Sequence, residues 1–369
     1  MKKILVAPVP ITPTKPLTPS HLKGVLWVDI LLKATSRIAE VACHYSPLVA
    51  LASEQTVGFW EYLDRRHKHV DFTDFTEEQV GEYYIRYHAE QSRPPYDAIA
   101  PYLKAVECGH WLHPVSQRLN EIWSSQFTAF GVQQFLQPKR PAALPVDELI
   151  DQLAERELCI DLRATGGALY LDLTEEGLPL RQAITRDGRH NYLVSFLREL
   201  VPLAPNYDHI VLVYDDGLDA DYFLLQRILS RFGADVRRVP LTRVPISGVV
   251  QSARQGGWQR YTASALLSHF ANPDADSQIF QLGARFYFVG VLGKSRKLSF
   301  DMNEFDYNVA RARRLATTSC NRRCDLPVDR FLKGCTIKQT YVDPFKVTTS
   351  LMSRRGSPFP SHALDGWYI

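Results

Sequence analysis

Thr18, Ser20 and His21 bring two hydroxyl groups and an imidazole together within four residues. They lie where an apolar strand, Ile4 to Val9, is expected to turn into a long helix. The N-terminus of such a helix would help to stabilise an oxyanion that develops during attack by a hydroxyl group. His21 could then act as the general base for Ser20. Ser20 could instead cap the helix, and His21 could serve only the shape of the loop.

A second group of polar side chains follows the apolar segment His209 to Tyr214. Tyr214, Asp215, Asp216 and Asp219 place three carboxylates and a phenol in one short loop. Carboxylates in a fork are what a planar guanidinium needs. The alternative is a solvated turn in which Asp219 or Asp221 caps the next helix.

Arginine is concentrated in two regions, although the formal net charge is only +3. The first runs from Arg227 to Arg260 and contains a single acid, Asp235. The second contains Arg311, Arg313, Arg314, Arg322, Arg323, Lys333, Arg354 and Arg355. Clustered guanidinium groups suit a polyphosphate partner, because each neutralised phosphate releases counterions. A solvated helix face with a flexible tail is the competing interpretation.

The elements that must position these side chains alternate between strand and helix. Helices are expected at residues 21–41, 146–157, 191–201 and 222–232, and strands at 4–9, 159–163, 168–173, 209–214 and 235–241. The aromatic stretch 55–137 reads as a helical insertion, followed by a proline-rich connector, 137–145. This alternation predicts an α/β fold with a parallel sheet and right-handed crossovers. Ligands of such sheets bind at the carboxyl ends of the strands, where the loops 8–20 and 214–219 begin.

Composition narrows the class of protein. A chain of 369 residues with 45% hydrophobic content can bury a large core. It lacks an apolar run of about 18 residues and a leader-like N-terminus, which predicts a soluble, cytoplasmic protein without membrane contact. The six cysteines are scattered, and Cys320, Cys324 and Cys335 lack the paired spacing of a zinc ribbon. We therefore expect reduced thiols and no metal.

The segment Lys15 to Gly24 resembles the Lys-Pro-Leu-His-Val-Gly-His-Leu-Arg-Gly signature of arginyl-tRNA synthetases. Thr18 stands at the first histidine, Ser20 at the glycine, and His21 is kept. Segments 174–185, 209–233 and 282–302 are similar to further parts of that family's catalytic domain, in the same order. The resemblance covers residues 1 to 305 and implies a Rossmann-like, class I synthetase-type fold.

The departures from the family bear on adenylation. In the family, the two histidines stabilise the reacting phosphorus, which Thr18 cannot do, and Ser20 places a side chain where the adenine ring should pack. The second signature, Lys-Met-Ser-Lys-Arg-Lys-Gly, aligns with residues 250–256, where all three lysines are absent. Oriented cations at that place stabilise a phosphoryl transition state. ATP chemistry is therefore expected to be lost.

The chain is identified as a member of the arginine-containing cyclodipeptide synthases, which resemble class I synthetase catalytic domains but lack ATP chemistry. The resemblance implies that arginyl-tRNA and a second charged tRNA yield a diketopiperazine, without a cofactor. It assigns Ser20 as the acyl acceptor, with Thr18 as the second candidate, and His21 as the base. The residues expected to bind the arginyl group are Tyr214, Asp215, Asp216 and Asp219. The tRNA contacts are expected at Lys23, Arg237, Arg238, Arg254, Arg260, Arg311, Arg313 and Arg314.

The expectation that the substrate is arginyl rests mainly on the overall resemblance, because Arg181 and Thr185 replace the family's tyrosine and aspartate. The expected organisation is a first catalytic half at 1–54, the helical insertion and connector at 55–145, a second catalytic half at 146–305 and a basic extension at 306–369. Two alternatives stay open: a synthetase paralogue that still adenylates an amino acid, and a non-catalytic tRNA-binding regulator. The second amino acid and the oligomeric state are not indicated by the sequence.

Overall fold

The structure is a computed structural model that describes residues 2–91, 93–109, 111–132, 143–250, 253–270, 273–319, 327–353 and 366–369. Most of the proline-rich connector lies outside these ranges, as do Cys320, Cys324, Arg322, Arg323, Arg354 and Arg355. The same holds for residues 251 and 252 in the remnant of the second signature.

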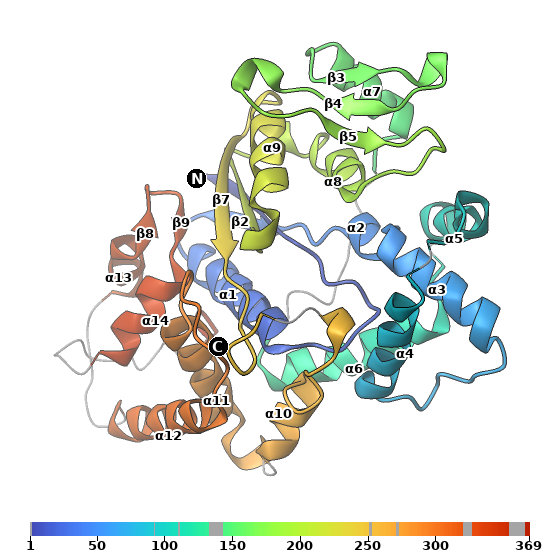
Figure 1. Cartoon of the computed structure of the whole chain (residues 1–369). Coiled ribbons are helices and arrows are strands. Elements are labelled where there is room, and N and C mark those ends of the chain that lie inside the picture. Colours follow the sequence, from blue (N-terminus) through green and yellow to red (C-terminus); the bar gives the residue numbers. More distant parts are fainter. Residues whose placement is uncertain are drawn as a thin grey trace.

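The central sheet has four parallel strands in the order β2-β1-β6-β7 (Figure 1). The strands are β1 (Lys3–Pro8), β2 (Glu40–Cys43), β6 (His209–Asp215) and β7 (Asp235–Leu241). Helix α1 (Pro19–Thr35) connects β1 to β2, and α9 (Asp219–Ser230) connects β6 to β7. The chain leaves β1 toward one edge and returns as β6 on its other side. The strand order therefore reverses between β1 and β6, where open α/β sheets bind their ligands.

Two hydrophobic cores flank this sheet, because successive strand residues point to opposite faces. Ile4 and Val6 of β1 belong to the core that contains α1, whereas Leu5 and Ala7 belong to the core formed with α8 (Tyr192–Leu200) and α9. A sheet that is covered on both faces needs this pattern. The predicted α/β fold with a parallel sheet flanked by helices is confirmed.

Residues 159–184 depart from the predicted parallel sheet. Strands β3 (Cys159–Asp161), β4 (Leu169–Leu171) and β5 (Arg181–Ile184) form a separate antiparallel sheet. The segments between them hold only 3₁₀ turns, at Arg163–Thr165 and Thr174–Glu176. A parallel neighbour needs a crossover of a dozen or more residues, which these connections do not offer.

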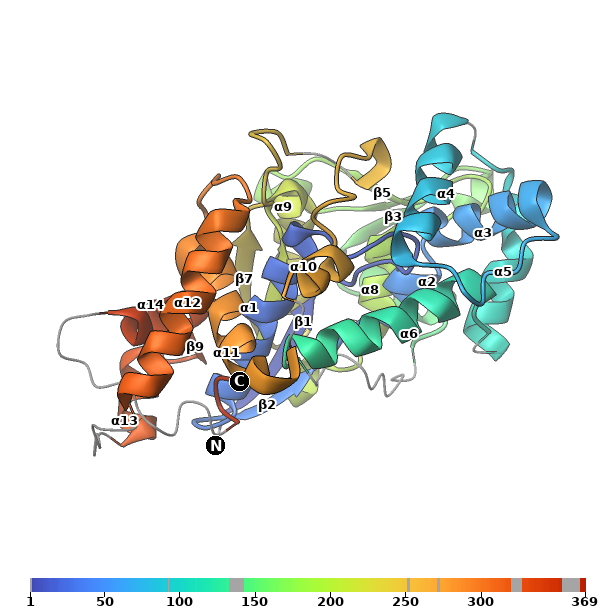
Figure 2. The same ribbon diagram turned by 90° about the horizontal axis from the view of Figure 1, so that it is seen from below.

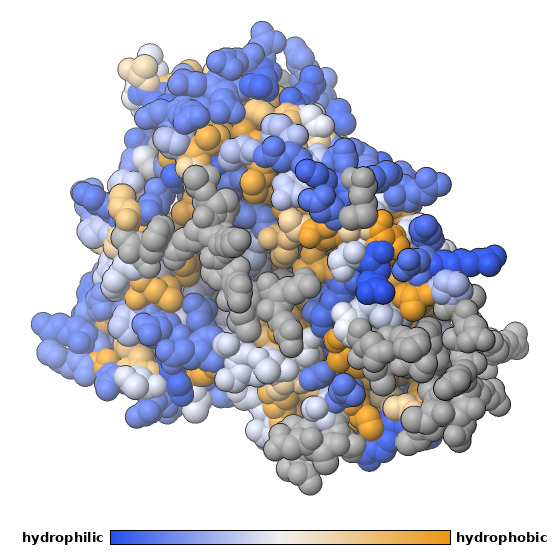
Figure 3. Space-filling view, turned by 180° about the vertical axis from the view of Figure 1, so that it is seen from behind, coloured by the Kyte–Doolittle hydropathy of each residue, from blue (hydrophilic) through white to orange (hydrophobic). Residues whose placement is uncertain are grey.

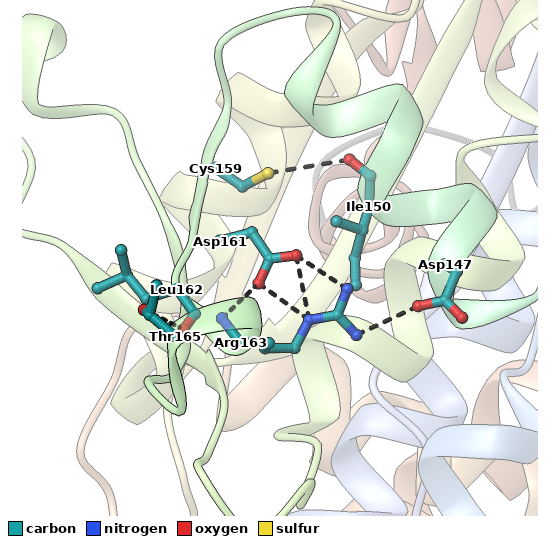
Figure 4. A network of polar contacts seen from close by, with 7 residues as sticks. All are labelled: Asp147, Ile150, Cys159, Asp161, Leu162, Arg163 and Thr165. Atoms are coloured by element: carbon teal, nitrogen blue, oxygen red, sulfur yellow. Dashed lines mark hydrogen bonds and ion pairs between the residues drawn. The ribbon is translucent and has the colours of Figure 1, made fainter.

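Arg163 joins this small sheet to helix α7 (Val146–Ala154) (Figure 4). Its Nη2 lies 2.9 Å from Asp161 Oδ2 and its Nε 2.9 Å from Asp161 Oδ1, in a bidentate pair, and its Nη1 lies 3.2 Å from Asp147 Oδ1. The planar guanidinium thus aligns the strand end with the start of the helix. The predicted strands exist, but they stand beside the central sheet.

The first helix is also shorter than the apolar spacing predicts. It ends at Thr35, and the segment Glu40–Cys43 forms β2 rather than a continuation to residue 41. Ile38 and Val41 fit a helical period, yet two apolar residues at the end of a pattern fit a strand equally well.

The aromatic insertion is helical, as its composition indicates. It contains α3 (Glu54–His67), α4 (Glu77–Ala89), α5 (Tyr96–Gly109) and α6 (Pro114–Ala129), and the short helix α2 (Pro47–Leu51) precedes it. Edge-to-face pairs hold these helices together; the Phe59 and Tyr84 ring centroids lie 5.6 Å apart, as do those of Trp60 and Trp111. Figure 2 shows the insertion on one side of the sheet, with the C-terminal helices on the other.

The C-terminal part packs around α1. It comprises α10 (Ala263–His269), α11 (Pro273–Arg285), a π-helix (Phe286–Val291), α12 (Met302–Ser319), α13 (Val328–Gly334), β8 (Thr336–Ile337), β9 (Tyr341–Val342) and α14 (Pro344–Met352). The π-helix, β9 and α14 contact α1, and α12 packs on α11. The described residues after 305 thus cover one side of α1 and of the core around it.

A fully buried ion pair ties these helices together. Arg285 Nη2 lies 2.5 Å from Asp29 Oδ2 of α1, and Lys33 Nζ lies 3.1 Å from Asp29 Oδ1. The same guanidinium donates to the carbonyls of Phe130 and Gly131 after α6. A buried arginine needs all of these acceptors, because an unpaired buried charge costs several kcal/mol, on the order of 3–5.

The surface is mixed in character. Figure 3 shows hydrophilic side chains over much of the face seen from behind, with apolar ones in patches between them. Of the helices that the structure describes, none combines the length and the apolar composition needed to cross a bilayer.

Helix α4 approaches the loop after β1 closely at Gly81. A Cβ atom there would lie 2.2 Å from the Trp258 ring and 2.9 Å from Pro16 Cδ. We expect Gly81→Ala to lower the free energy of unfolding by about 1–3 kcal/mol, because the rigid indole ring cannot yield. Gly334→Ala is the matched control, since nothing lies within 4 Å of its added Cβ. Chemical denaturation measures both; equal stability of the two variants would contradict the close contact.

Candidate functional site

A cavity that is partly open to solvent lies where the strand order reverses. Its walls come from the end of β1 and the following loop, the first turns of α1, and the ends of β6 and β7. Lys15, Thr18, Ser20 and His21 line it together with Asp215. The structure therefore brings the three predicted catalytic residues and part of the acidic loop to one place.

The loop that carries these side chains is held on both sides of Leu17. The Leu17 amide donates to Glu77 Oε2 at 3.1 Å, and its carbonyl accepts from the Ala263 amide at 2.9 Å. Glu77 also accepts from Gln126 Nε2 at 2.8 Å and from the Ser264 amide at 2.9 Å. Burial raises the pKa of Glu77, which its hydrogen bonds oppose. The insertion and α10 thus fix the loop through one buried carboxylate, which the sequence did not reveal.

Helix α1 begins with Thr18 as its N-cap, Pro19 at the first position and His21 at the third. The Thr18 amide donates to His21 Nδ1 at 3.1 Å, and Thr18 Oγ1 lies 3.2 Å from the same nitrogen. This is a capping box with histidine in the place of the usual glutamate. Ser20 lies inside the first turn, so the interpretation of Ser20 as N-cap is wrong.

Ser20 contacts a different part of the cavity. Its Oγ accepts from the Val244 amide at 2.9 Å and lies 3.5 Å from the Val244 carbonyl oxygen. Among the hydrogen bonds of the described residues, none joins Ser20 to His21. The imidazole faces Thr18, so the geometry pairs His21 with the second of the two predicted hydroxyls.

Cations and burial set the protonation of the cavity. Burial, followed by the charges of Lys15 and Arg243, lowers the pKa of His21 to about 3. Burial, followed by the charges of Arg254 and Arg243, lowers the pKa of Lys15 to about 7, against an opposing effect of Asp215. The Lys15 amine lies 5.7 Å from the centroid of the Tyr84 ring. At neutral pH, His21 is an unprotonated acceptor and Lys15 is divided between its two forms.

The acidic loop is already paired with arginines of this chain. Asp215 forms an ion pair with Arg243 and accepts from the Gly217 amide at 2.9 Å. Asp219 lies 3.0 Å from Arg238 and accepts from Tyr214 Oη at 2.5 Å. Two of the three carboxylates predicted for a substrate guanidinium, Asp215 and Asp219, therefore hold internal guanidinium groups in this structure.

The remaining residues of this loop differ in exposure. Tyr214 is buried and its ring stacks on Tyr222, with centroids 4.1 Å apart. Asp216 is exposed in the 3₁₀ turn Asp216–Leu218. Leu218 is the N-cap of α9, and Asp219 and Asp221 lie in its first turn. The prediction that Asp219 or Asp221 caps this helix is therefore wrong, because both lie inside its first turn. Carboxylates in a first turn still stabilise a helix.

Lys23 does not lie on the surface. It is 1% exposed, its Nζ donates to the Thr242 carbonyl at 2.9 Å, and burial lowers its pKa to about 8. This corrects the prediction of a tRNA contact, since the amine links α1 to the end of β7. Its apolar stem fits the core, which the charge count could not indicate.

The predicted arginines are spread over several elements. On β7, Arg237 pairs with Asp235 at 2.6 Å and Arg238 with Asp219. Arg254 lies in a 3₁₀ turn that packs on α4 and donates to Gln55 Oε1 at 3.2 Å, and Arg260 is exposed nearby in sequence. The other three lie on α12, where Arg311 donates to the Met352 carbonyl, and Arg313 and Arg314 are exposed. They do not form one continuous surface, because α12 packs on α11 and the π-helix, away from α4 (Figure 1).

Within the described ranges, no three histidine, cysteine, aspartate or glutamate side chains lie close enough to hold a metal ion together. Cys335 is one of the three cysteines whose spacing does not fit a zinc ribbon, and it is buried with a free thiol.

No protein-family model matches this chain, and no curated protein matches it. Among solved structures, it is similar to the arginyl-tRNA synthetase of Thermus thermophilus, with a TM-score of 0.60 and 13% identity over 100% of this chain and 79% of that one. For a putative arginyl-tRNA synthetase from Campylobacter jejuni the TM-score is 0.56 at 12% identity, over 100% of this chain and 83% of that one. For the arginyl-tRNA synthetase of Plasmodium falciparum the TM-score is 0.56 at 11% identity, over 95% of this chain and 64% of that one.

At such low identity this likeness concerns the fold alone. The chain has an arginyl-tRNA synthetase-like, class I fold, and the first two matches extend past residue 305, where the sequence resemblance stopped.

The low pKa of His21 predicts a pH effect on stability. The unfolded chain protonates this imidazole below about 6.5, whereas the folded chain does so near 3. Stability that is present above pH 6.5 is therefore lost as the pH falls toward 3, on the order of 3 kcal/mol at pH 4. We expect His21→Gln to lose less stability than the unaltered protein between pH 7 and pH 4 in chemical denaturation. An imidazole that titrates near pH 6 by NMR would contradict this.

Proposed function

We propose that this chain is a tRNA-dependent cyclodipeptide synthase that joins an arginyl group and a second aminoacyl group from charged tRNAs, without ATP. The observation that carries the proposal is the Thr18 hydroxyl, 3.2 Å from the neutral His21 imidazole, in the cavity at the strand reversal. A hydroxyl beside an unprotonated base serves acyl transfer. Thr18 replaces the histidine that a synthetase would use on phosphorus.

In the proposed reaction, Thr18 Oγ1 attacks the carbonyl carbon of the aminoacyl ester while its proton passes to His21 Nδ1. The ester bond breaks, and the terminal ribose oxygen of the tRNA takes that proton back. Pro19 has no N–H and the His21 amide faces Thr18 in the capping box, so the Ser20 amide is the first-turn donor that would stabilise the oxyanion. The developing negative charge also raises the proton affinity of His21, which is otherwise a weak base.

The second half of the reaction uses only the two substrates. The α-amino group of the second aminoacyl-tRNA attacks the ester on Thr18, which forms the first peptide bond and frees the hydroxyl. The remaining amino group then attacks the second ester, so that the ring closes and the second tRNA leaves. The two ester bonds supply the free energy of both amides, and ATP is not consumed.

Arg243 gives a physical reason for an arginyl substrate. It pairs with Asp215 at the cavity, and 41% of its side chain is exposed, so it can turn into solvent. A substrate guanidinium that takes its place leaves the charge beside Asp215 unchanged. Exchange of one guanidinium for another avoids an unpaired carboxylate, which an apolar substrate would create.

One observation favours a second candidate function, a synthetase paralogue that adenylates an amino acid. Lys15, Arg243 and Arg254 place three cations at or beside the cavity, and among the described residues that line it Asp215 is the only carboxylate. An excess of positive charge suits a triphosphate. Arginine-dependent exchange of pyrophosphate into ATP is the reaction that this candidate predicts.

The decisive experiment combines two assays on the purified protein. We expect an arginine-containing diketopiperazine, detected by mass spectrometry, from arginyl-tRNA and a mixture of charged tRNAs without ATP. We also expect no arginine-dependent exchange of pyrophosphate into ATP. Exchange without diketopiperazine would establish the paralogue, and tight tRNA binding with neither reaction would establish a non-catalytic regulator.

The hydroxyl assignment has its own test. We expect Thr18→Val to lower the formation of aminoacyl-enzyme by about 10²-fold or more, because the nucleophile is lost while the shape is kept. Thr18→Ser should restore it, and Ser20→Ala should retain most of it. Intact-protein mass spectrometry after incubation with arginyl-tRNA measures the adduct. Loss of the adduct in Ser20→Ala but not in Thr18→Val would return the role to Ser20.

A further inference from the structure

A second cavity, which is also partly open to solvent, adjoins the first. Ile11 and Tyr45 line both cavities. Tyr45 Oη accepts from the Ile11 amide at 2.5 Å and lies 3.3 Å from the Ile11 carbonyl oxygen, so the two residues form one clamped unit. This unit is the common wall of the two cavities.

The walls of the second cavity are mainly apolar. Pro13, Pro47, Leu51 and Phe127 contribute to them, with Trp123 at 4% exposure. The polar lining residues of α6 are exposed, as Glu121 is, except for Ser124, which is half-buried. Among the described residues that line this cavity, none is a lysine or an arginine. A phosphate or a carboxylate would find no cation there, whereas an aromatic or aliphatic group would be removed from water.

We propose that this cavity holds the side chain of the second aminoacyl group, and that this side chain is aromatic or large and aliphatic. The inference rests on the proposed function. Two aminoacyl carbonyls must meet for a peptide bond to form, so their side-chain sites must adjoin, as these cavities do. The first cavity holds Lys15, Asp215 and Arg243 and suits a charged group, while the second suits an apolar one.

The test supplies arginyl-tRNA together with one other charged tRNA at a time, in separate reactions with phenylalanyl-, leucyl-, aspartyl- and lysyl-tRNA. We expect the initial rate of mixed diketopiperazine formation to be at least 10-fold higher with the phenylalanyl or leucyl group than with the charged ones. Equal or higher rates with aspartyl- or lysyl-tRNA would overturn this inference and leave the proposed function standing. Absence of any diketopiperazine would overturn the proposed function, and the inference with it.

Substitutions in the second cavity test whether it selects the second aminoacyl group. Ala50→Phe fills the cavity from a buried wall and Ser124→Phe from a half-buried one, and Ala89→Phe, exposed at the end of α4, is the control. We expect either cavity variant to lower the phenylalanyl rate at least 10-fold relative to the alanyl rate. Circular dichroism establishes folding, and Ser124→Phe serves if Ala50→Phe is unfolded. A phenylalanyl-to-alanyl ratio equal to that of Ala89→Phe in a folded cavity variant would overturn the placement.

Discussion

The buried carboxylate of Glu77 is the constraint on which the arrangement of the cavity depends. It accepts hydrogen bonds from Leu17, Gln126 and Ser264, which belong to the loop after β1, the insertion and α10. Without it, the amides of Leu17 and Ser264 would lose this acceptor, whereas the Gln126 amide would keep only its contact with Ser264 Oγ. Thr18 follows Leu17 directly, so the position of its hydroxyl is set by a residue of the insertion. A loop of several prolines is stiff, but stiffness alone does not specify where it points.

The parts of the fold that follow from local patterns were accessible from the sequence. The strand, loop and helix at the start, the buried strand before Tyr214 and the helical insertion are all present. The capping relation between Thr18 and His21 was also within reach, because their spacing of three residues and Pro19 between them are the marks of a helix start. The resemblance drew attention to Ser20 instead. Glu77 could not be found this way, since it is distant in sequence from each of its partners.

The sequence also does not reveal which charged side chains are available to a partner. A count of arginines between residues 227 and 260 suggests one basic surface, but Arg237 and Arg238 are neighbours on a strand and point to opposite faces. One pairs with Asp235 and the other with Asp219. Lys23 lies on the inner face of α1 and is buried. Sequence reports how many charges a segment carries, whereas tertiary structure decides which of them remain available to a partner.

Tyr45 and Ile11, which are held together by the Tyr45 hydroxyl group, form a wall that the two cavities share. A side chain that serves as a partition gives to one compartment whatever volume it removes from the other. Any substitution at Tyr45 therefore alters the room on both sides at once, and the backbone of Ile11 moves with it because both of its polar atoms contact the same phenol oxygen. The two compartments cannot be resized independently at this position, so a change in the preference of one must be accompanied by an adjustment in the other.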